Sequence, residues 1–121
     1  MDLIHVCLNV ADGERAVEWY TEELGFEESW SFESGDTTNY YVAADNGVEI
    51  QLADTAGETP DEIGTAWDHL AVLVDDCDAA FERVENHGVV QEPADNDAAG
   101  SRTAFIRDPD GHVVELVQPL D

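Results

Sequence analysis

Residues 3–10 read LIHVCLNV, and apolar side chains alternate with His5, Cys7 and Asn9 along this run. Such alternation is typical of a β-strand that packs one face on a core and turns the other face away from it. A similar run, HLAVLV, occupies residues 69–74, and a histidine opens it as well. The two runs begin a repeat of about 65 residues, which indicates a duplicated module rather than a solenoid.

The predicted elements follow the same order in both halves: a strand, a helix and then further strands. In the first half Asp12 is a candidate helix N-cap, and Gly25 is a candidate helix end. In the second half Asp75 and Asp76 are candidate N-caps, and the helix is expected to end near Gly88. The sequence therefore predicts an α+β fold with two tandem βαβββ modules in a single domain, residues 1–121.

Changes in composition set the predicted boundaries. We expect module one at residues 1–53, a linker rich in small and polar residues at 54–66, and module two at 67–121. Within module two, residues 89–91 are expected to form a strand and residues 92–100 an acidic loop.

Each half also places one histidine and one glutamate inside apolar, strand-like runs. His5 is followed by Glu49 in the run VEIQL, and His69 is followed by Glu115 in the run VVELV. A single histidine in a strand more often has a structural role, but two matched histidine–glutamate pairs favour metal binding. Burying four such groups without a cation would be costly, so the pattern predicts a metal site built from both halves.

Other histidines and aromatic residues have simpler interpretations. His87 and His112 are expected at the surface or at helix ends, and Trp19 and Tyr20 are expected to pack against the core. For Trp30, both a packing role and a place in the wall of an apolar pocket stay open.

The charge balance is extreme, with 29 acidic residues against 4 basic ones and a formal net charge of −25. No basic face exists to neutralise phosphates, so we expect no nucleic-acid partner. No apolar run approaches the ~18 residues of a membrane-spanning helix, so we expect no membrane association. Salt screens the self-repulsion of such a surface, which predicts a cytoplasmic protein in the high-salt cytosol of a halophile. An acidic surface for a basic partner is the alternative.

Four stretches carry a resemblance to a known family. They are LIHV at residues 3–6, AVEWYTEELGF at 16–26, IGTAWDH at 63–69 and FIRDPDGHVVEL at 105–116. The chain resembles the vicinal-oxygen-chelate superfamily, and within it bacterial-type glyoxalase I (lactoylglutathione lyase). The resemblance implies the glyoxalase/bleomycin-resistance/dioxygenase-like fold, in which βαβββ modules are paired around a metal.

The resemblance also implies a reaction. Glyoxalase I acts on the hemithioacetal that a thiol forms with a 2-oxoaldehyde such as methylglyoxal, and converts it through an enediolate to a 2-hydroxyacyl thioester. By matching, the metal ligands are His5, Glu49, His69 and Glu115, with Glu115 as the principal catalytic base and Glu49 as its counterpart across the metal. One divalent ion per site is implied, with Ni²⁺ or Co²⁺ favoured and Zn²⁺ as the alternative.

Members of this family usually place each site at a homodimer interface. One chain would then contribute His5 and Glu49, and the other would contribute His69 and Glu115. The small-molecule partner implied is the thiol adduct itself.

The chain departs from the family pattern at the positions that normally bind the carboxylates of glutathione. Asn9 stands in place of an arginine, Ala53 in place of an asparagine, and Arg102 is the cation nearest to the position of a loop lysine. Asn9 and Arg102 are therefore the candidate substrate-binding residues, and the identity of the thiol stays open. An acyl-CoA epimerase, a thiol transferase, a dioxygenase and a non-catalytic small-molecule-binding protein are the alternatives.

The net charge of −25 predicts stabilisation by salt. Raising KCl from about 0.1 M to about 2 M shortens the Debye length from ~10 Å to below ~3 Å and screens the self-repulsion. The thermal unfolding midpoint, followed by circular dichroism, should then rise by at least about 5 °C. NaCl at equal ionic strength should act alike, since screening does not depend on ion identity; a midpoint independent of salt would contradict the prediction.

Overall fold

The computed structural model describes residues 1–61 and 63–121. The chain divides into two compact units, Met1–Glu62 and Ile63–Asp121. This division falls within the predicted linker, although the last strand of the first unit continues two residues past the predicted end of module one.

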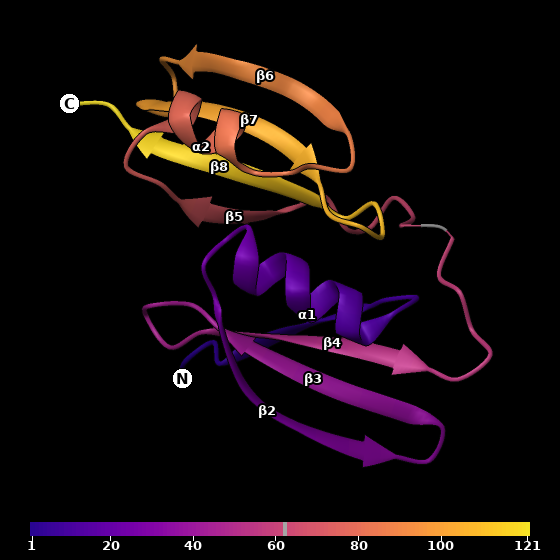
Figure 1. The fold of residues 1–121 in the computed structure, drawn as a ribbon. Coiled ribbons are helices and arrows are strands. Elements are labelled where there is room, and N and C mark those ends of the chain that lie inside the picture. Colours follow the sequence, from indigo (N-terminus) through magenta and orange to yellow (C-terminus); the bar gives the residue numbers. More distant parts are fainter. Residues whose placement is uncertain (62) are drawn as a thin grey trace. The chain divides into compact units, whose positions relative to one another are not determined.

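The first unit contains a four-stranded mixed sheet and one helix (Figure 1). Its strands lie in the order β1-β4-β3-β2, with β1 parallel to β4 and the other neighbours antiparallel. In chain order the elements are β1 (His5–Asn9), α1 (Gly13–Glu22), β2 (Glu27–Ser34), β3 (Thr37–Ala43) and β4 (Glu49–Thr55).

The second unit repeats this topology, with strand order β5-β8-β7-β6 and β5 parallel to β8. The predicted α+β fold of two βαβββ modules is therefore confirmed. The elements are β5 (Leu70–Leu73), α2 (Cys77–Arg83), β6 (Val89–Asn96), β7 (Ser101–Arg107) and β8 (Val113–Pro119).

One local prediction in the second unit is wrong. Residues 92–96 belong to β6 and not to an acidic loop, because β6 continues to pair with β7 as far as Asn96 opposite Ser101. The hydrophilic composition of this segment hid its strand character, because β6 lies at the edge of the sheet, where both faces can meet solvent.

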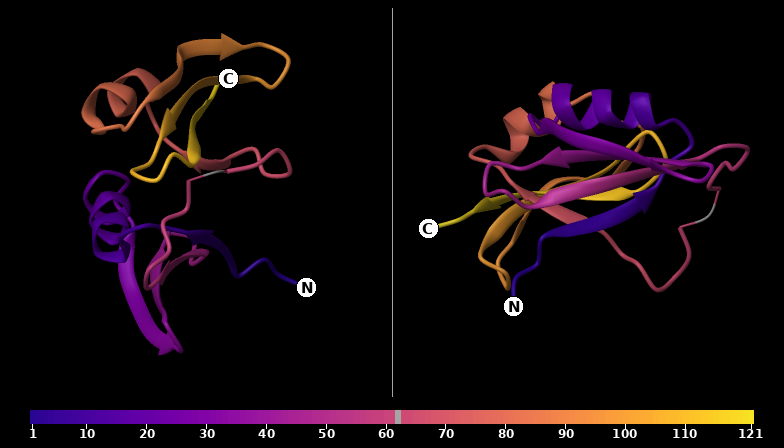
Figure 2. Two further views of the ribbon diagram at one scale, coloured as in Figure 1. Left: turned by 90° about the vertical axis from the view of Figure 1, so that its right-hand side faces the viewer. Right: turned by 90° about the horizontal axis from the view of Figure 1, so that it is seen from below.

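Each helix lies across one face of its own sheet (Figures 1 and 2). In the first unit Leu8 and Leu52 are buried beneath α1, which contributes Ala16 and Tyr20 to the same core. In the second unit the strands contribute a comparable buried set. His5, Cys7 and Asn9 alternate with the half-buried Val6 and the buried Leu8 of β1, so they belong to the sheet face that α1 does not cover.

Matching aspartates cap the two helices. Asp12 accepts the backbone N–H of Arg15, and Asp76 accepts that of Ala79. Their backbone angles are nearly the same, with φ −141° and ψ 104° at Asp12 and φ −141° and ψ 106° at Asp76. The predicted N-cap at Asp12 is confirmed, and of the two second-half candidates the structure selects Asp76.

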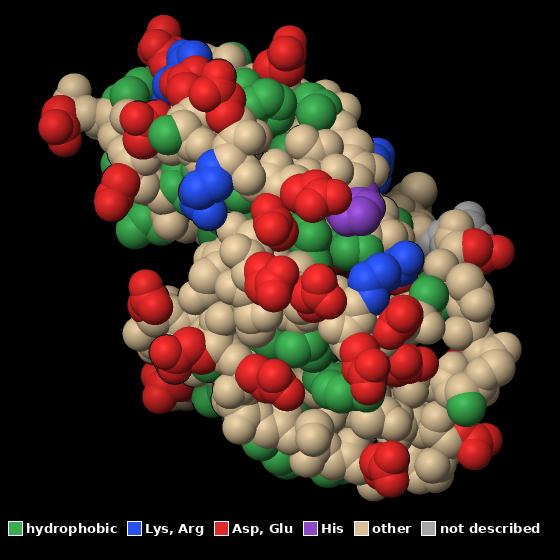
Figure 3. Space-filling model, in the orientation of Figure 1, with side chains coloured by type: hydrophobic (Ala, Val, Ile, Leu, Met, Phe, Trp, Pro, Cys, Tyr) green, Lys and Arg blue, Asp and Glu red, His purple; other side chains and the backbone are tan. Residues whose placement is uncertain are grey.

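Acidic side chains are spread over the visible surface of both units (Figure 3). Within residues 1–61 and 63–121, no helix has the length and apolar character needed to cross a membrane.

The capping geometry predicts different effects for two neighbouring aspartates. Asp76→Ala should lower the free energy of unfolding by about 1 kcal/mol, because the N–H of Ala79 loses its acceptor. Asp75→Ala removes the same charge without removing that acceptor and is the matched control. Equal losses in the two variants, measured by chemical denaturation, would contradict the assignment of the cap.

Candidate metal-binding residues

In the first unit the candidate residues lie at the start of two adjacent parallel strands. His5 of β1 is directly opposite Glu49 of β4, and Cys7 is opposite Gln51. His5 and Glu49 are both half-buried. Neighbouring strands lie about 4.8 Å apart, so the pairing holds residues that are distant in sequence side by side.

Glu49 and His5 have different immediate partners. The Ser29 hydroxyl donates a hydrogen bond to Oε2 of Glu49. The His5 ring meets the Tyr41 ring edge-on, with centroids 5.6 Å apart and an interplanar angle of 86°. Burial, then the nearby Cys7 and Glu49, raise the pKa of Tyr41, so its hydroxyl stays protonated at neutral pH.

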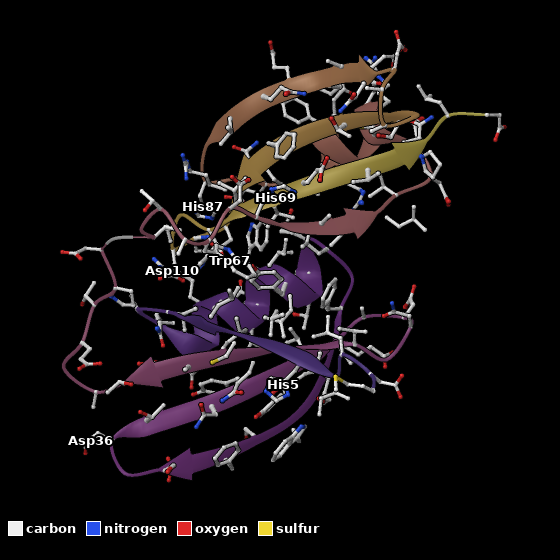
Figure 4. All side chains as sticks on the ribbon, turned by 180° about the vertical axis from the view of Figure 1, so that it is seen from behind. His5, Asp36, Trp67, His69, His87 and Asp110 are labelled. Atoms are coloured by element: carbon white, nitrogen blue, oxygen red, sulfur yellow. The ribbon has the colours of Figure 1, made fainter. Side chains whose placement is uncertain are left out.

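In the second unit the histidine and the glutamate are in direct contact. Nε2 of His69 lies 3.0 Å from Oε1 of Glu115, and Nδ1 lies 2.5 Å from Oδ1 of Asp68. Phe105 packs edge-on against His69, with ring centroids 5.2 Å apart and an interplanar angle of 89°. Figure 4 labels His5 and His69 on their respective units.

Asp68 is a residue that sequence reasoning missed. Its hydrogen bond is the largest influence on the pKa of His69 and raises it, whereas burial opposes this shift and the charge of Glu115 adds to it. Metal-binding histidines commonly use their second ring nitrogen in this way, since a carboxylate partner sets the tautomer and the ring orientation. The signal was the position of Asp68 directly before the histidine.

The donor types suit a divalent transition metal. Imidazole nitrogens and carboxylate oxygens are ligands of Ni²⁺, Co²⁺ and Zn²⁺. Within residues 1–61 and 63–121, however, no three His, Cys, Asp or Glu side chains form a cluster that could hold an ion. The structure instead brings candidate residues together in pairs: His5 lies opposite Glu49, and His69 contacts Glu115.

The two predicted substrate-binding residues are in different settings. Asn9 is exposed and lines a cavity of about 390 Å³ together with Ala53, Thr55 and Glu58. Arg102 lies on the helix-covered face of its sheet, where Asp78 of α2 and Asp95 of β6 bind its guanidinium at 2.7 and 3.0 Å. These hydrogen bonds raise the pKa of Arg102. The structure does not bring Arg102 to the sheet face of Glu115.

The prediction for His112 is wrong. This side chain is only 6% exposed, and its Nδ1 lies 2.8 Å from Oδ2 of the fully buried Asp108. Asp108 also accepts the backbone N–H groups of Asp110 and His112, which orders the turn that leads into β8. His87 is exposed, as predicted.

The aromatic residues divide as the sequence indicated. Trp19 and Tyr20 are buried in the core of the first unit. Trp30 is 50% exposed and stacks on Tyr41 with ring centroids 4.3 Å apart, and Phe32 stacks on Trp30 at 5.3 Å. Because Tyr41 also contacts His5, an apolar surface adjoins the candidate ligands.

Comparisons with known proteins agree with this fold. A sequence profile of the Glyoxalase/Bleomycin resistance protein/Dioxygenase superfamily matches residues 2–116. The lactoylglutathione lyase of Escherichia coli O157:H7 is 30% identical, and the match covers 100% of this chain and 95% of that protein.

Two solved structures show the range of similar proteins. Glyoxalase I from Zea mays is 25% identical with a TM-score of 0.87, over 98% of this chain and 45% of the maize chain. This chain therefore spans less than half the length of the maize enzyme. TnmS3, an antibiotic binding protein from Streptomyces sp. CB03234, is 26% identical with a TM-score of 0.77, over 98% of this chain and 96% of that chain.

Proposed function

Because the chain belongs to the Glyoxalase/Bleomycin resistance protein/Dioxygenase superfamily, we propose that it is a glyoxalase-type lyase. Its substrate is the hemithioacetal of a thiol and a 2-oxoaldehyde such as methylglyoxal, and its product is a 2-hydroxyacyl thioester. The observation that carries the proposal is the contact between His69, which directly precedes β5, and Glu115 of β8. In the first unit, the corresponding strand β1 carries His5. The net charge of −25 supports a high-salt cytoplasm as its setting.

The residues that would hold a divalent ion are His5, His69, Glu115 and an oxygen donor on β4. The sequence nominates Glu49 as that donor, and Ni²⁺ or Co²⁺ as the ion. When bound, the ion would supply Lewis-acid stabilisation of negative charge on a substrate oxygen, which is worth several kcal/mol.

Glu115 is the residue we assign as the base. Its carboxylate, 18% exposed at the side chain, is held by His69 at 3.0 Å on the sheet face that α2 does not cover. In this role it removes the proton from the carbon next to the carbonyl and returns it to the neighbouring carbon. A partly buried carboxylate in a fixed position suits general acid–base catalysis, since no reorientation is needed between the two transfers.

The thiol half of the substrate meets an unusual surface. The cavity beside Asn9 is lined by uncharged residues and Glu58, and no arginine or lysine is among them. Glutathione carries two carboxylates, and proteins normally bind such groups with cationic side chains. This lining does not match glutathione, so the test of turnover uses a panel of thiols.

We further propose that the working unit is a homodimer. Each copy would contribute His5 and its β4 donor to one site and His69 with Glu115 to the other. The support for this arrangement is the resemblance to a family whose members usually place each site at a homodimer interface.

A small-molecule-binding protein without catalysis is the second candidate. The similarity to TnmS3 and the exposed stack of Trp30 and Phe32 favour it. A binding protein has no need of the contact between His69 and Glu115, so metal content and turnover separate the two functions.

Turnover is tested with methylglyoxal and a panel of thiols in high salt with added Ni²⁺ or Co²⁺. His69→Ala should lower kcat/KM by on the order of 100-fold or more, because it removes a metal ligand and the partner of Glu115. His87→Ala removes an exposed histidine from the same unit and should change little. If no thiol yields a thioester with metal-loaded protein, the lyase is excluded and the binding protein is favoured.

Mixing two inactive variants tests the shared site. In a heterodimer of His5→Ala and His69→Ala chains, one site carries both substitutions and the other carries neither. Random exchange should therefore restore about one quarter of wild-type activity. No recovery after exchange, confirmed by mass spectrometry of the mixed dimers, would show that each site is built within one chain.

A further inference from the structure

The strand register of the two units gives a position-by-position correspondence. Glu115 lies opposite Ala71 of β5 and Phe105 of β7. Gln51 lies opposite Cys7 of β1 and Tyr41 of β3. Ala71 comes two residues after one histidine, and Cys7 comes two residues after the other. By register, the counterpart of Glu115 is therefore Gln51.

Glu49 occupies a different position in this correspondence. It lies opposite Ala43 of β3, and the residue of β8 in the same place, opposite Arg107, is Val113. The spacing along the chain agrees, since His69 and Glu115 are separated by 46 residues and Gln51 is 46 residues after His5.

The ring contacts support the same correspondence. The ring opposite Glu115 is Phe105, which meets His69 edge-on at 5.2 Å and 89°. The ring opposite Gln51 is Tyr41, which meets His5 edge-on at 5.6 Å and 86°. Each unit thus repeats a triplet of histidine, aromatic ring and oxygen-bearing side chain.

Side-chain hydrogen bonds distinguish Gln51 from Glu49. Nε2 of Gln51 donates a hydrogen bond to Oδ1 of the buried Asn39 at 2.8 Å. The amide oxygen of Gln51 can therefore accept a hydrogen bond or bind a metal ion. Glu49 instead accepts a hydrogen bond from the hydroxyl of Ser29.

Ser29 lies at the β-bulge of β2, between Glu28 and Trp30. One of the two bulges of β6 lies at the equivalent place, between Val89 and Gln91, where Val90 has no hydroxyl. Val90 and Val113 therefore stand where the first unit has Ser29 and Glu49, so this pair is an addition beside the repeated triplet.

We propose that Gln51, through its amide oxygen, is the β4 donor that binds the divalent ion together with His5, and that Glu49 stays with Ser29 and off the ion. This proposal rests on the proposed function, because it concerns the same metal. The ligand set then has two imidazoles, one amide and one carboxylate. Glu115 becomes the single ligand carboxylate, so the base on one side of the substrate has no carboxylate counterpart on the other.

The test is a Co²⁺ titration of metal-free, full-length protein, followed by calorimetry and by the visible absorption bands of bound Co²⁺. Gln51→Ala should weaken Co²⁺ binding by at least about tenfold, as loss of even a supporting residue does. Glu49→Gln is isosteric and should leave the affinity within about threefold and the bands unchanged. Gln51→Glu should bind Co²⁺ more tightly and shift the bands, since a charged ligand replaces a neutral one.

Thermal unfolding confirms that each variant is folded. If Gln51→Ala does not fold, the isosteric pair Gln51→Glu and Glu49→Gln decides the result. Loss of Co²⁺ in Glu49→Gln, with unchanged binding in the Gln51 variants, would overturn the inference. If His5→Ala and His69→Ala also lose Co²⁺ in that case, the proposed metal site survives without Gln51. If the wild-type protein binds no Co²⁺, Ni²⁺ or Zn²⁺, both proposals fail.

Discussion

The parallel pairing of the first and last strands in each unit is the constraint on which the candidate site depends. β1 pairs with β4 and β5 pairs with β8, so residues far apart in sequence become neighbours on one sheet face. The helix on the opposite face holds this register in place. A slip of one residue would turn buried Leu52 or Leu116 outward and direct the polar side chains into the core.

Duplication preserved the backbone more closely than the side chains. Both units keep the strand order, the aspartate cap and the edge-on contact between a histidine and an aromatic ring. The residue beside that ring differs, with an amide at Gln51 and a carboxylate at Glu115. Two similar frames in this way present different side-chain chemistry.

The shortage of cations affects structure and recognition together. Of the 4 basic residues in the chain, two in the second unit have local partners: Arg102 binds Asp78 and Asp95, and Arg107 donates to the carbonyl of Gly111. The cavity beside Asn9 has no such group. The polar groups that line it are hydroxyls, an amide and the carboxylate of Glu58, which differ from the cationic side chains that bind anions.

Local patterns in the sequence determined the fold. Alternating strands, Asp caps and the repeat of about 65 residues predicted two βαβββ modules, and the repeated histidine–glutamate pairs nominated His5, Glu49, His69 and Glu115 as metal ligands. Only the tertiary structure decided which side chains meet. Glu49 and Gln51 alternate with the same buried residues and are equivalent by periodicity, so their roles depend on the cross-strand partners Ser29, Asn39 and Tyr41. Likewise, Arg102 and His112 owe their positions to Asp78 and Asp108, because hydrogen bonding to a fixed partner outweighs the general preference of a polar residue for the surface.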